Sequence, residues 1–177
     1  APPHVVGQIG FVVALAVHDT VKMHCPGQSV KLKWPNDCLL DGGKVAGILC
    51  ENLGQGSVAI GCGINVEHSP QGLAYATANI RHHAPEAAVA TVFATYRANL
   101  DARLQQWQDG QGFPVIISDW QDRAANLNAM VTVTQGGVTR SGLFRGLSPD
   151  GAMRLEKPDG TIEMVYAGDV TLNAVPS

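Results

Sequence analysis

The fold of this chain is decided by residues 29–66, which have the sequence SVKLKWPNDCLLDGGKVAGILCENLGQGSVAIGCGINV. Polar and apolar residues alternate over residues 29–34, as in a half-buried strand. The Pro-Asn-Asp step at 35–37 should end this strand, because proline lacks a backbone donor and Asn-Asp favours a turn. Glycine-containing turns separate the segments that follow. We therefore expect a stack of short antiparallel strands, over residues 29–34, 38–40, 44–51 and 57–61.

Three helices are expected around these strands. Over residues 5–21 apolar side chains recur at steps of three and four, the period of a buried helical stripe. Residues 113–123 predict a short helix with Val115, Ile116 and Trp120 directed inward. Residues 67–85 have no clean period, which predicts an irregular loop over an opening. Residues 86–108 predict a long helix with one apolar stripe, formed by Val89, Val92, Phe93, Tyr96, Leu100, Leu104 and Trp107.

The character of the sequence changes near residue 126. Hairpin-type turns occur at 135–137, 148–151 and 157–160. Strands at a spacing of about ten residues are typical of a small SH3-like barrel. We expect an α+β (α/β) protein, with a mixed or antiparallel sheet and packed helices in residues 1–126 and the barrel in residues 127–177. The expected barrel strands are residues 131–134, 139–146, 152–156, 161–166 and 169–172.

Composition excludes several classes of protein. With 177 residues, of which 45% are hydrophobic and 15% charged, the chain is long enough to form a hydrophobic core. Its longest apolar run, Ile9 to Val17, falls short of the roughly 20 residues that a membrane-spanning helix needs. The net charge is −3 and the basic residues do not cluster, so nucleic acid is not an expected partner. We expect a soluble cytoplasmic protein without a signal peptide.

Cysteines and histidines do not indicate a metal site. The four cysteines lack the C-x-x-C pairs of a zinc ribbon, so we expect free, mostly buried thiols in a reducing compartment. The histidines form neither a metal-binding trio nor a nucleophile pair, and we expect solvated side chains. Adjacent His82 and His83 are expected to point apart. The cysteines are Cys25, Cys38, Cys50 and Cys62, and the other histidines considered are His18 and His68.

Charged, amide and glycine residues converge within residues 31–66. Asp37 and Lys44 flank the turn at 41–43, and a hairpin brings such residues into register, within reach of each other and of a shared ligand. A surface ion pair worth roughly 0–1 kcal/mol is the alternative. Gly47 either allows a ligand to approach the strand backbone or marks a bulge. Asn65 has the donor and acceptor that could bind a purine edge.

Three blocks of this region resemble those of biotin protein ligases. The chain has KWPND at 33–37, KVAGILCE at 44–51 and IGCGINV at 60–66. These are similar to the family blocks K-W-P-N-D, K-[LIV]-A-G-[IV]-L-x-E and [IV]-G-x-G-[IL]-N-[VM], in the same order and with similar gaps. The resemblance covers nearly the whole chain and implies a class II synthetase-like catalytic core followed by an SH3-like domain.

The resemblance implies a ligase that works in two steps. Biotin and MgATP form biotinyl-5'-AMP and pyrophosphate, and the biotinyl group is then transferred to a lysine of a biotin carboxyl carrier protein domain. ATP, biotin and Mg are therefore the implied substrates and cofactor. A second copy of the chain is a candidate partner, as a homodimer. The alternatives are a lipoate or octanoyl transferase, whose family lacks the KWPND block, and a non-catalytic fragment that binds the carrier or the nucleotide.

The same resemblance assigns roles to individual residues. Lys44 matches the lysine that contacts the biotin carboxylate and the phosphate, and Asp37 matches the carboxylate near the acceptor lysine. These two are the expected catalytic residues. Gly47 and Ile48 match the strand whose backbone lies along the biotin rings, and Asn65 matches the amide near the adenine. The expected substrate-binding residues are Lys44, Gly47, Ile48, Asn65, Trp34 and Asn36.

One feature of the family is not found in this sequence. The catalytic domain of the family begins with a Gly-Arg-rich loop of the kind G-R-G-R-x-G-R, which folds over biotin and the phosphates. The arginines considered for this loop lack glycine neighbours of that form, and they are Arg81, Arg97, Arg103 and Arg123. We therefore expect a chain that begins after this part of the site, as a truncated or split ligase. The DNA-binding domain of some members is likewise expected to be absent.

Overall fold

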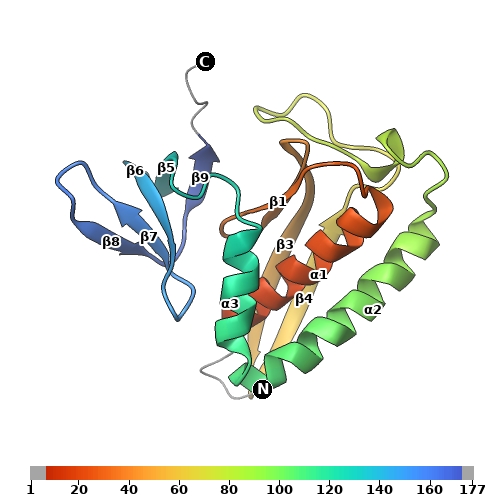
Figure 1. The fold of residues 1–177 in the computed structure, drawn as a ribbon, viewed down its shortest axis with the longest axis horizontal. Helices are drawn as coiled ribbons and strands as arrows, with labels where there is room; N and C mark the ends of the chain where they lie inside the picture. The colour runs from red at the N-terminus through yellow and green to blue at the C-terminus, as the bar shows by residue number, and fades with distance from the viewer. Residues whose placement is uncertain (1–6, 173–177) are drawn as a thin grey trace.

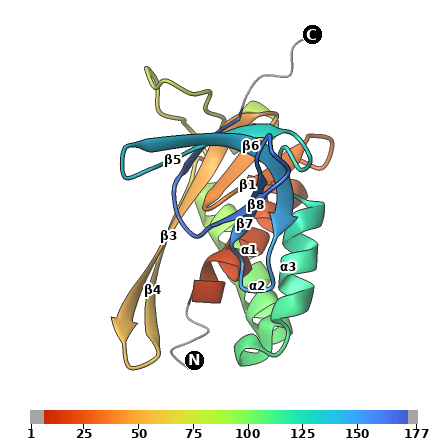
Figure 2. The ribbon, with the colours of Figure 1, turned by 90° about the vertical axis from the view of Figure 1, so that its left-hand side faces the viewer.

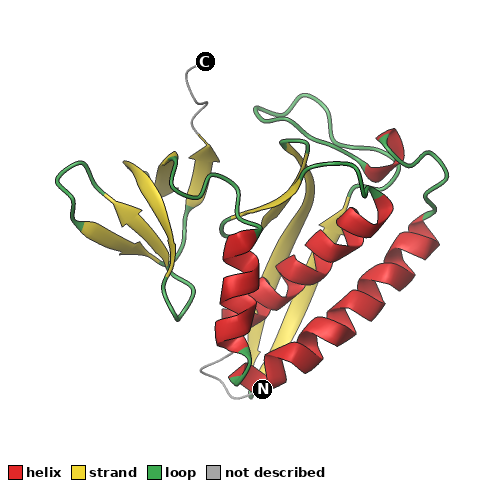
Figure 3. Cartoon of the chain, in the orientation of Figure 1, coloured by secondary structure: helices red, strands yellow, loops and turns green. Residues whose placement is uncertain are grey.

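Four antiparallel strands in the order β1-β2-β3-β4 form the first sheet, and three helices cover one of its faces (Figures 1 and 3). The structure, a computed structural model, describes residues 7–172. The expected hairpin stack is confirmed, while the predicted helix start at residues 5–6 lies outside the described residues. The strands are β1 (Val30–Lys33), β2 (Asp37–Leu40), β3 (Gly43–Gly54) and β4 (Ser57–Ile64), and the helices are α1 (Ile9–His24), α2 (Val89–Trp107) and α3 (Phe113–Asp122).

Helix α1 lies at the centre of this layer. It contacts strands β1, β2 and β3 on one side and helices α2 and α3 on the other, so most of its circumference is buried. This explains the nearly continuous apolar run in its sequence, because a helix buried on several sides needs no polar face. Within residues 7–172, no helix combines the length and the apolar character needed to cross a membrane.

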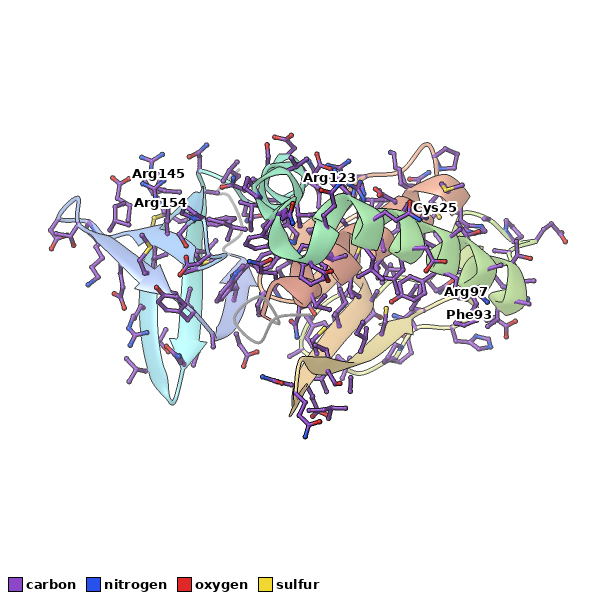
Figure 4. The ribbon with its side chains drawn as sticks, turned by 90° about the horizontal axis from the view of Figure 1, so that it is seen from below. Cys25, Phe93, Arg97, Arg123, Arg145 and Arg154 are labelled. Atoms are coloured by element: carbon purple, nitrogen blue, oxygen red, sulfur yellow. The ribbon has the colours of Figure 1, made fainter. Side chains whose placement is uncertain are left out.

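The predicted apolar stripe of α2 is wrong at two positions. Phe93 is 60% exposed and Val89 is also exposed, whereas Val92, Tyr96 and Trp107 are buried. Only a narrow strip of the α2 surface packs against α1, so residues beside this strip face solvent. Figure 4 shows Phe93 and Arg97 on α2, far from Arg145 and Arg154 of the second sheet.

The predicted inward side of α3 is wrong at one position. Val115 is exposed, while the buried residues follow the i, i+3, i+4, i+7 pattern from the start of the helix. Val115 lies one residue before the second member of this pattern, and therefore about 100° away around the helix. The buried residues of α3 are Phe113, Ile116, Ile117 and Trp120.

A network of charged side chains joins the three helices. The guanidinium of Arg103 in α2 donates to Asp19 of α1 at 2.6 and 2.8 Å and to Asp119 of α3 at 2.6 Å. Burial raises the pKa of Asp19, but hydrogen bonds with His18 and Arg103 and the charge of Arg103 outweigh it, so the net pKa is lowered. One cation therefore holds carboxylates from two helices.

The second sheet has five antiparallel strands in the order β8-β7-β6-β5-β9 and forms the expected SH3-like unit. It contacts the first layer through the turn between β6 and β7, where the indole Nε1 of Trp34 donates to the Gly151 carbonyl at 3.3 Å. The expected domain division after residue 126 stays a prediction. The strands are β5 (Met130–Gln135), β6 (Val138–Leu147), β7 (Met153–Glu156), β8 (Ile162–Val165) and β9 (Asp169–Leu172).

Gly151 lies at a close contact between the two layers. Its φ is +90°, and a Cβ atom there would lie 2.6 Å from Cε2 of Phe11 in α1. We expect Gly151→Ala to lower the free energy of unfolding through both strain and overpacking. Gly160→Ala is the matched control, because Gly160 has a φ of +82° with no atom within 4 Å of the added Cβ.

Chemical denaturation of the two variants should separate these effects. Gly151→Ala is expected to destabilise the protein by about 1–3 kcal/mol more than Gly160→Ala, which is the typical cost of overpacking. Equal losses would show that the contact with Phe11 contributes nothing beyond backbone strain.

Candidate functional site

A row of four residues crosses the first sheet on the face opposite the helices. In the strand register Lys33 lies opposite Asp37, Asp37 opposite Gly47, and Gly47 opposite Gly63. The neighbouring positions, including Ala46 and Ile48, pack into the core, so alternation places this row on the helix-free side. The two glycines leave bare backbone at one end of the row, and the charged residues occupy the other.

Two lysines bind the same carboxylate. The Nζ of Lys44 lies 2.5 Å from Oδ1 of Asp37, and the Nζ of Lys33 lies 3.0 Å from Oδ2. The expected proximity of Asp37 and Lys44 is therefore confirmed. The pair is only partly at the surface, since Asp37 is 8% exposed while the Lys44 side chain is 31% exposed.

Gly47 provides the space in which Lys44 reaches Asp37. A Cβ at Gly47 would lie 3.2 Å from Cε and 3.3 Å from Nζ of Lys44. The alternative of a bulge at Gly47 is wrong, because the register shift falls between the pairs Cys38–Ala46 and Leu39–Lys44 and leaves Val45 as the extra residue. The absence of a side chain at Gly47 is thus explained by the lysine that crosses it.

A cavity of about 80 Å³ opens beside this cluster. One side of the cavity is lined by Lys44, Gly47, Gly63 and Asn65. The other side is lined by Tyr75, which lies in the loop expected over residues 67–85. The loop is fixed to β3 by backbone hydrogen bonds, from the Lys44 N–H to the Ala76 carbonyl at 2.9 Å and from the Ala78 N–H to the Lys44 carbonyl at 3.0 Å. The backbone of Lys44 is therefore held on both sides.

Asn65 and Tyr75 give this cavity its polar and aromatic walls. The side-chain nitrogen of Asn65 donates to the carbonyls of Lys44 at 3.3 Å and Ala78 at 3.0 Å. The Tyr75 ring centroid lies 5.8 Å from the Lys44 ammonium, within the range of a cation–π interaction. Both residues are thus positioned relative to the same lysine.

The other three expected substrate-binding residues line a separate cavity. Trp34, Asn36 and Ile48 lie along a cavity of about 440 Å³, which also includes Gly151 from the second sheet. Asn36 and Ile48 are joined by two hydrogen bonds, from Asn36 Nδ2 to the Ile48 carbonyl at 3.0 Å and from the Ile48 N–H to the Asn36 carbonyl at 2.9 Å. These residues therefore fix the loop that precedes Asp37.

Sequence reasoning assigned no role to Lys33 or Tyr75. A signal for Lys33 was present, because a tight turn at residues 34–36 brings Lys33 opposite Asp37 across the β1-β2 pair. No comparable signal existed for Tyr75, which lies in a loop without periodicity. Figure 2 shows the β3-β4 hairpin continuing from the site to a projecting end beyond the helices.

The thiols and imidazoles of residues 7–172 form no three-residue group that could hold a metal ion. The cysteines are free, as expected, but only Cys25 and Cys38 are buried. Burial raises the pKa of Cys62 to about 11, so this thiol is protonated at neutral pH. Across residues 7–172, no group of three His, Cys, Asp or Glu side chains is placed to hold a metal ion.

Two expectations about histidines are wrong. The rings of His82 and His83 meet edge to face with centroids 4.8 Å apart, because these residues lie at the end of a 3₁₀ turn (Ile80–His82) and not on a regular strand or helix. His18 is buried, since it lies in the enclosed helix α1, and its Nδ1 is 3.1 Å from the Asp19 carboxylate.

Comparison with known families identifies two matching segments. Residues 3–67 match the Biotin/lipoate A/B protein ligase family, and residues 127–172 match the Biotin protein ligase C terminal domain. The first segment contains the Lys33–Asp37–Lys44 cluster, and the second coincides with the five-stranded sheet.

Individual proteins match most of the chain. The biotin--[acetyl-CoA-carboxylase] ligase of Paracoccus denitrificans is 36% identical over 173 residues, covering 92% of this chain and 72% of that protein. The ligase of the same name from Mycobacterium tuberculosis is 32% identical over 170 residues, covering 93% of this chain and 62% of that protein. The biotin protein ligase from Aquifex aeolicus in complex with biotin and ATP has the same fold, with a TM-score of 0.79 at 20% identity over 95% of this chain and 72% of that chain.

Proposed function

Because this chain belongs to the biotin protein ligase family, we propose that it activates biotin with ATP and transfers the biotinyl group to a lysine of a biotin carboxyl carrier protein. The observation that supports this most directly is the cluster of Lys33, Asp37 and Lys44 beside a cavity with a glycine-lined floor. Such a site combines positive charge for phosphate chemistry with flat backbone against which a ring system can lie.

In the first step a carboxylate oxygen of biotin attacks the α-phosphorus of ATP. A new P–O bond forms, the bond from the α-phosphorus to the bridging oxygen breaks, and pyrophosphate leaves with that oxygen. The reacting groups are both anionic, so an ammonium group between them lowers their repulsion and stabilises the charge that builds up. We assign this role to Lys44, whose side chain lines the cavity.

In the second step the amine of the carrier lysine attacks the acyl carbon of biotinyl-5'-AMP. The C–N bond forms, the C–O bond to the phosphate breaks, and AMP leaves. The acceptor ammonium must first lose one proton. We propose that Asp37 accepts this proton and then passes it to water. The second proton leaves the nitrogen as the tetrahedral intermediate collapses and departs with AMP.

The remaining predicted residues divide into two groups. We propose that the biotin rings lie along Gly47 and its partner Gly63, where no side chain intervenes, and that Asn65 accepts from the adenine amino group through Oδ1. Trp34, Asn36 and Ile48 support the Asp37 loop, and their direct contact with substrate stays a prediction. We propose residues 1–126 as the catalytic part and residues 127–177 as the SH3-like part.

Magnesium is proposed to enter with the nucleotide. The carboxylate of the cluster, Asp37, is already paired with two lysines, which makes it a poor ligand for a further cation. The metal, bound to the phosphates, would neutralise part of their charge. The free cysteines support a reducing compartment, and we propose the cytoplasm.

Incubation of the protein with biotin, MgATP and an apo carrier domain tests this function. We expect biotin on the carrier, detected by avidin blot, and no signal when the acceptor lysine of the carrier is replaced by arginine. Labelling with lipoate in place of biotin, with biotin refused, would instead identify a lipoate ligase.

A further inference from the structure

We propose that Lys33 is a positioning residue that keeps Asp37 paired while Lys44 moves from this carboxylate to the substrate phosphate. The inference rests on the proposed function, because it assigns Lys44 to the adenylation step. It adds a role for Lys33 and an order of events in the site. The observation that carries it is the attachment of two ammonium groups to the two oxygens of one nearly buried carboxylate.

Lys44 interacts less strongly with a phosphate while its charge is shared with Asp37. Its Nζ lies 2.5 Å from Oδ1, so part of the ammonium charge is offset by this carboxylate. Asp37 is 8% exposed, and removing the partner of a buried charge is strongly unfavourable. The release of Lys44 is therefore costly unless another cation remains in place.

Lys33 is that cation. Its Nζ holds Oδ2 at 3.0 Å, on the oxygen that Lys44 does not occupy. When Lys44 leaves, Asp37 still has one ion pair, so the carboxylate remains compensated. Lys33 thus allows Lys44 to leave Asp37, because it keeps this carboxylate paired, and it does so without contact with the substrate.

The surroundings of Lys44 permit a movement of the side chain alone. The backbone of Lys44 is fixed by hydrogen bonds with Ala76 and Ala78. The side chain is 31% exposed and crosses Gly47, where no Cβ obstructs it. Tyr75 lies on the cavity side, with its ring centroid 5.8 Å from the ammonium group, and offers an attractive surface in that direction.

The movement also determines when the carrier lysine can bind. Once Lys44 is on the phosphate, Oδ1 of Asp37 is free to accept the ammonium group of the carrier. While Lys44 stays on Asp37, its ammonium group lies on the same oxygen and repels a second cation. The carrier lysine should therefore bind Asp37 more readily once Lys44 has moved.

Comparison of a single and a double variant tests the role of Lys33, with pyrophosphate release as the measure of adenylation. In Lys33→Met, Lys44 should remain bound to Asp37, and we expect adenylation to slow by about tenfold, the order of effect of one hydrogen bond to a charged group. Lys33→Met/Asp37→Asn should regain most of this rate, because a neutral residue no longer retains Lys44, although transfer to the carrier is lost. Lys33→Arg should keep most of the parent rate.

Lys31→Met is the matched control. Lys31 is an exposed lysine two residues earlier on the same side of β1, and its removal should leave adenylation unchanged. A double variant as slow as Lys33→Met, or a Lys33→Met variant as fast as the parent, would overturn the inference. A parent protein that releases no pyrophosphate with biotin and ATP would instead refute the proposed function, so the two failures are distinguishable.

Discussion

Replacement of Lys44 by alanine should slow the formation of biotinyl-5'-AMP by about 100- to 1000-fold, the usual loss when a donor that stabilises transition-state charge is removed. The same change should alter the free energy of unfolding by less than about 1 kcal/mol, the range of partly exposed ion pairs. Stability is retained because Asp37 keeps its second partner, Lys33. Pyrophosphate release and thermal melting measure the two effects separately.

Lys31→Ala serves as the control for the loss of a lysine from this sheet. It should leave both the rate and the melting temperature unchanged. If Lys44→Ala lowered the melting temperature steeply and activity fell only in proportion to the folded fraction, Lys44 would be a structural residue.

A large loss of stability is expected from Arg103→Met. This variant removes the cation that hydrogen-bonds both Asp19 and Asp119 and leaves only Arg123, 3.8 Å from each carboxylate. We expect the free energy of unfolding to fall by about 2–3 kcal/mol, somewhat below the cost of breaking a fully buried pair. Arg97→Met, an exposed arginine of the same helix, is the control and should remain within about 0.5 kcal/mol of the parent.

The effect of Arg103→Met should depend on pH. The pKa of Asp19 is lowered in the folded protein, so its contribution to stability is present above the usual value of 3.8 and is lost as the pH falls through the lower folded value. The difference between parent and variant should therefore be largest at neutral pH and should narrow below about pH 4. Urea unfolding at pH 7 and pH 3.5 measures it, and an equal difference at both values would exclude Asp19 as the source.

The hairpin residues could be predicted because local geometry fixes their positions. A short turn at residues 41–43 pairs β2 with β3, which brings Asp37 and Lys44 into the same region. The expected register is wrong, because Asp37 lies opposite Gly47 and Lys44 opposite Leu39, and the Lys44 side chain reaches Asp37 by crossing Gly47. The same reasoning applied to the turn at 34–36 would have added Lys33. Periodicity likewise located the helices, since each packs at least one apolar face.

The remaining features depend on contacts between distant parts of the chain. The narrow contact between α2 and α1, which leaves Phe93 in solvent, follows from how the helices pack and not from the spacing of apolar residues. Tyr75 reaches the site on a loop without periodicity. Trp34 and Asn36 line a cavity that is completed by Gly151, which is 117 residues from Trp34.

This long-range contact has a consequence for heat inactivation. The indole of Trp34, only 3% exposed, is held from outside its own sheet by the Gly151 carbonyl, and Asp37 follows three residues later. Local opening of the five-stranded sheet would remove this support while the helices remain folded. If the five-stranded sheet opens first, we expect activity to be lost at a lower temperature than the helical circular dichroism signal.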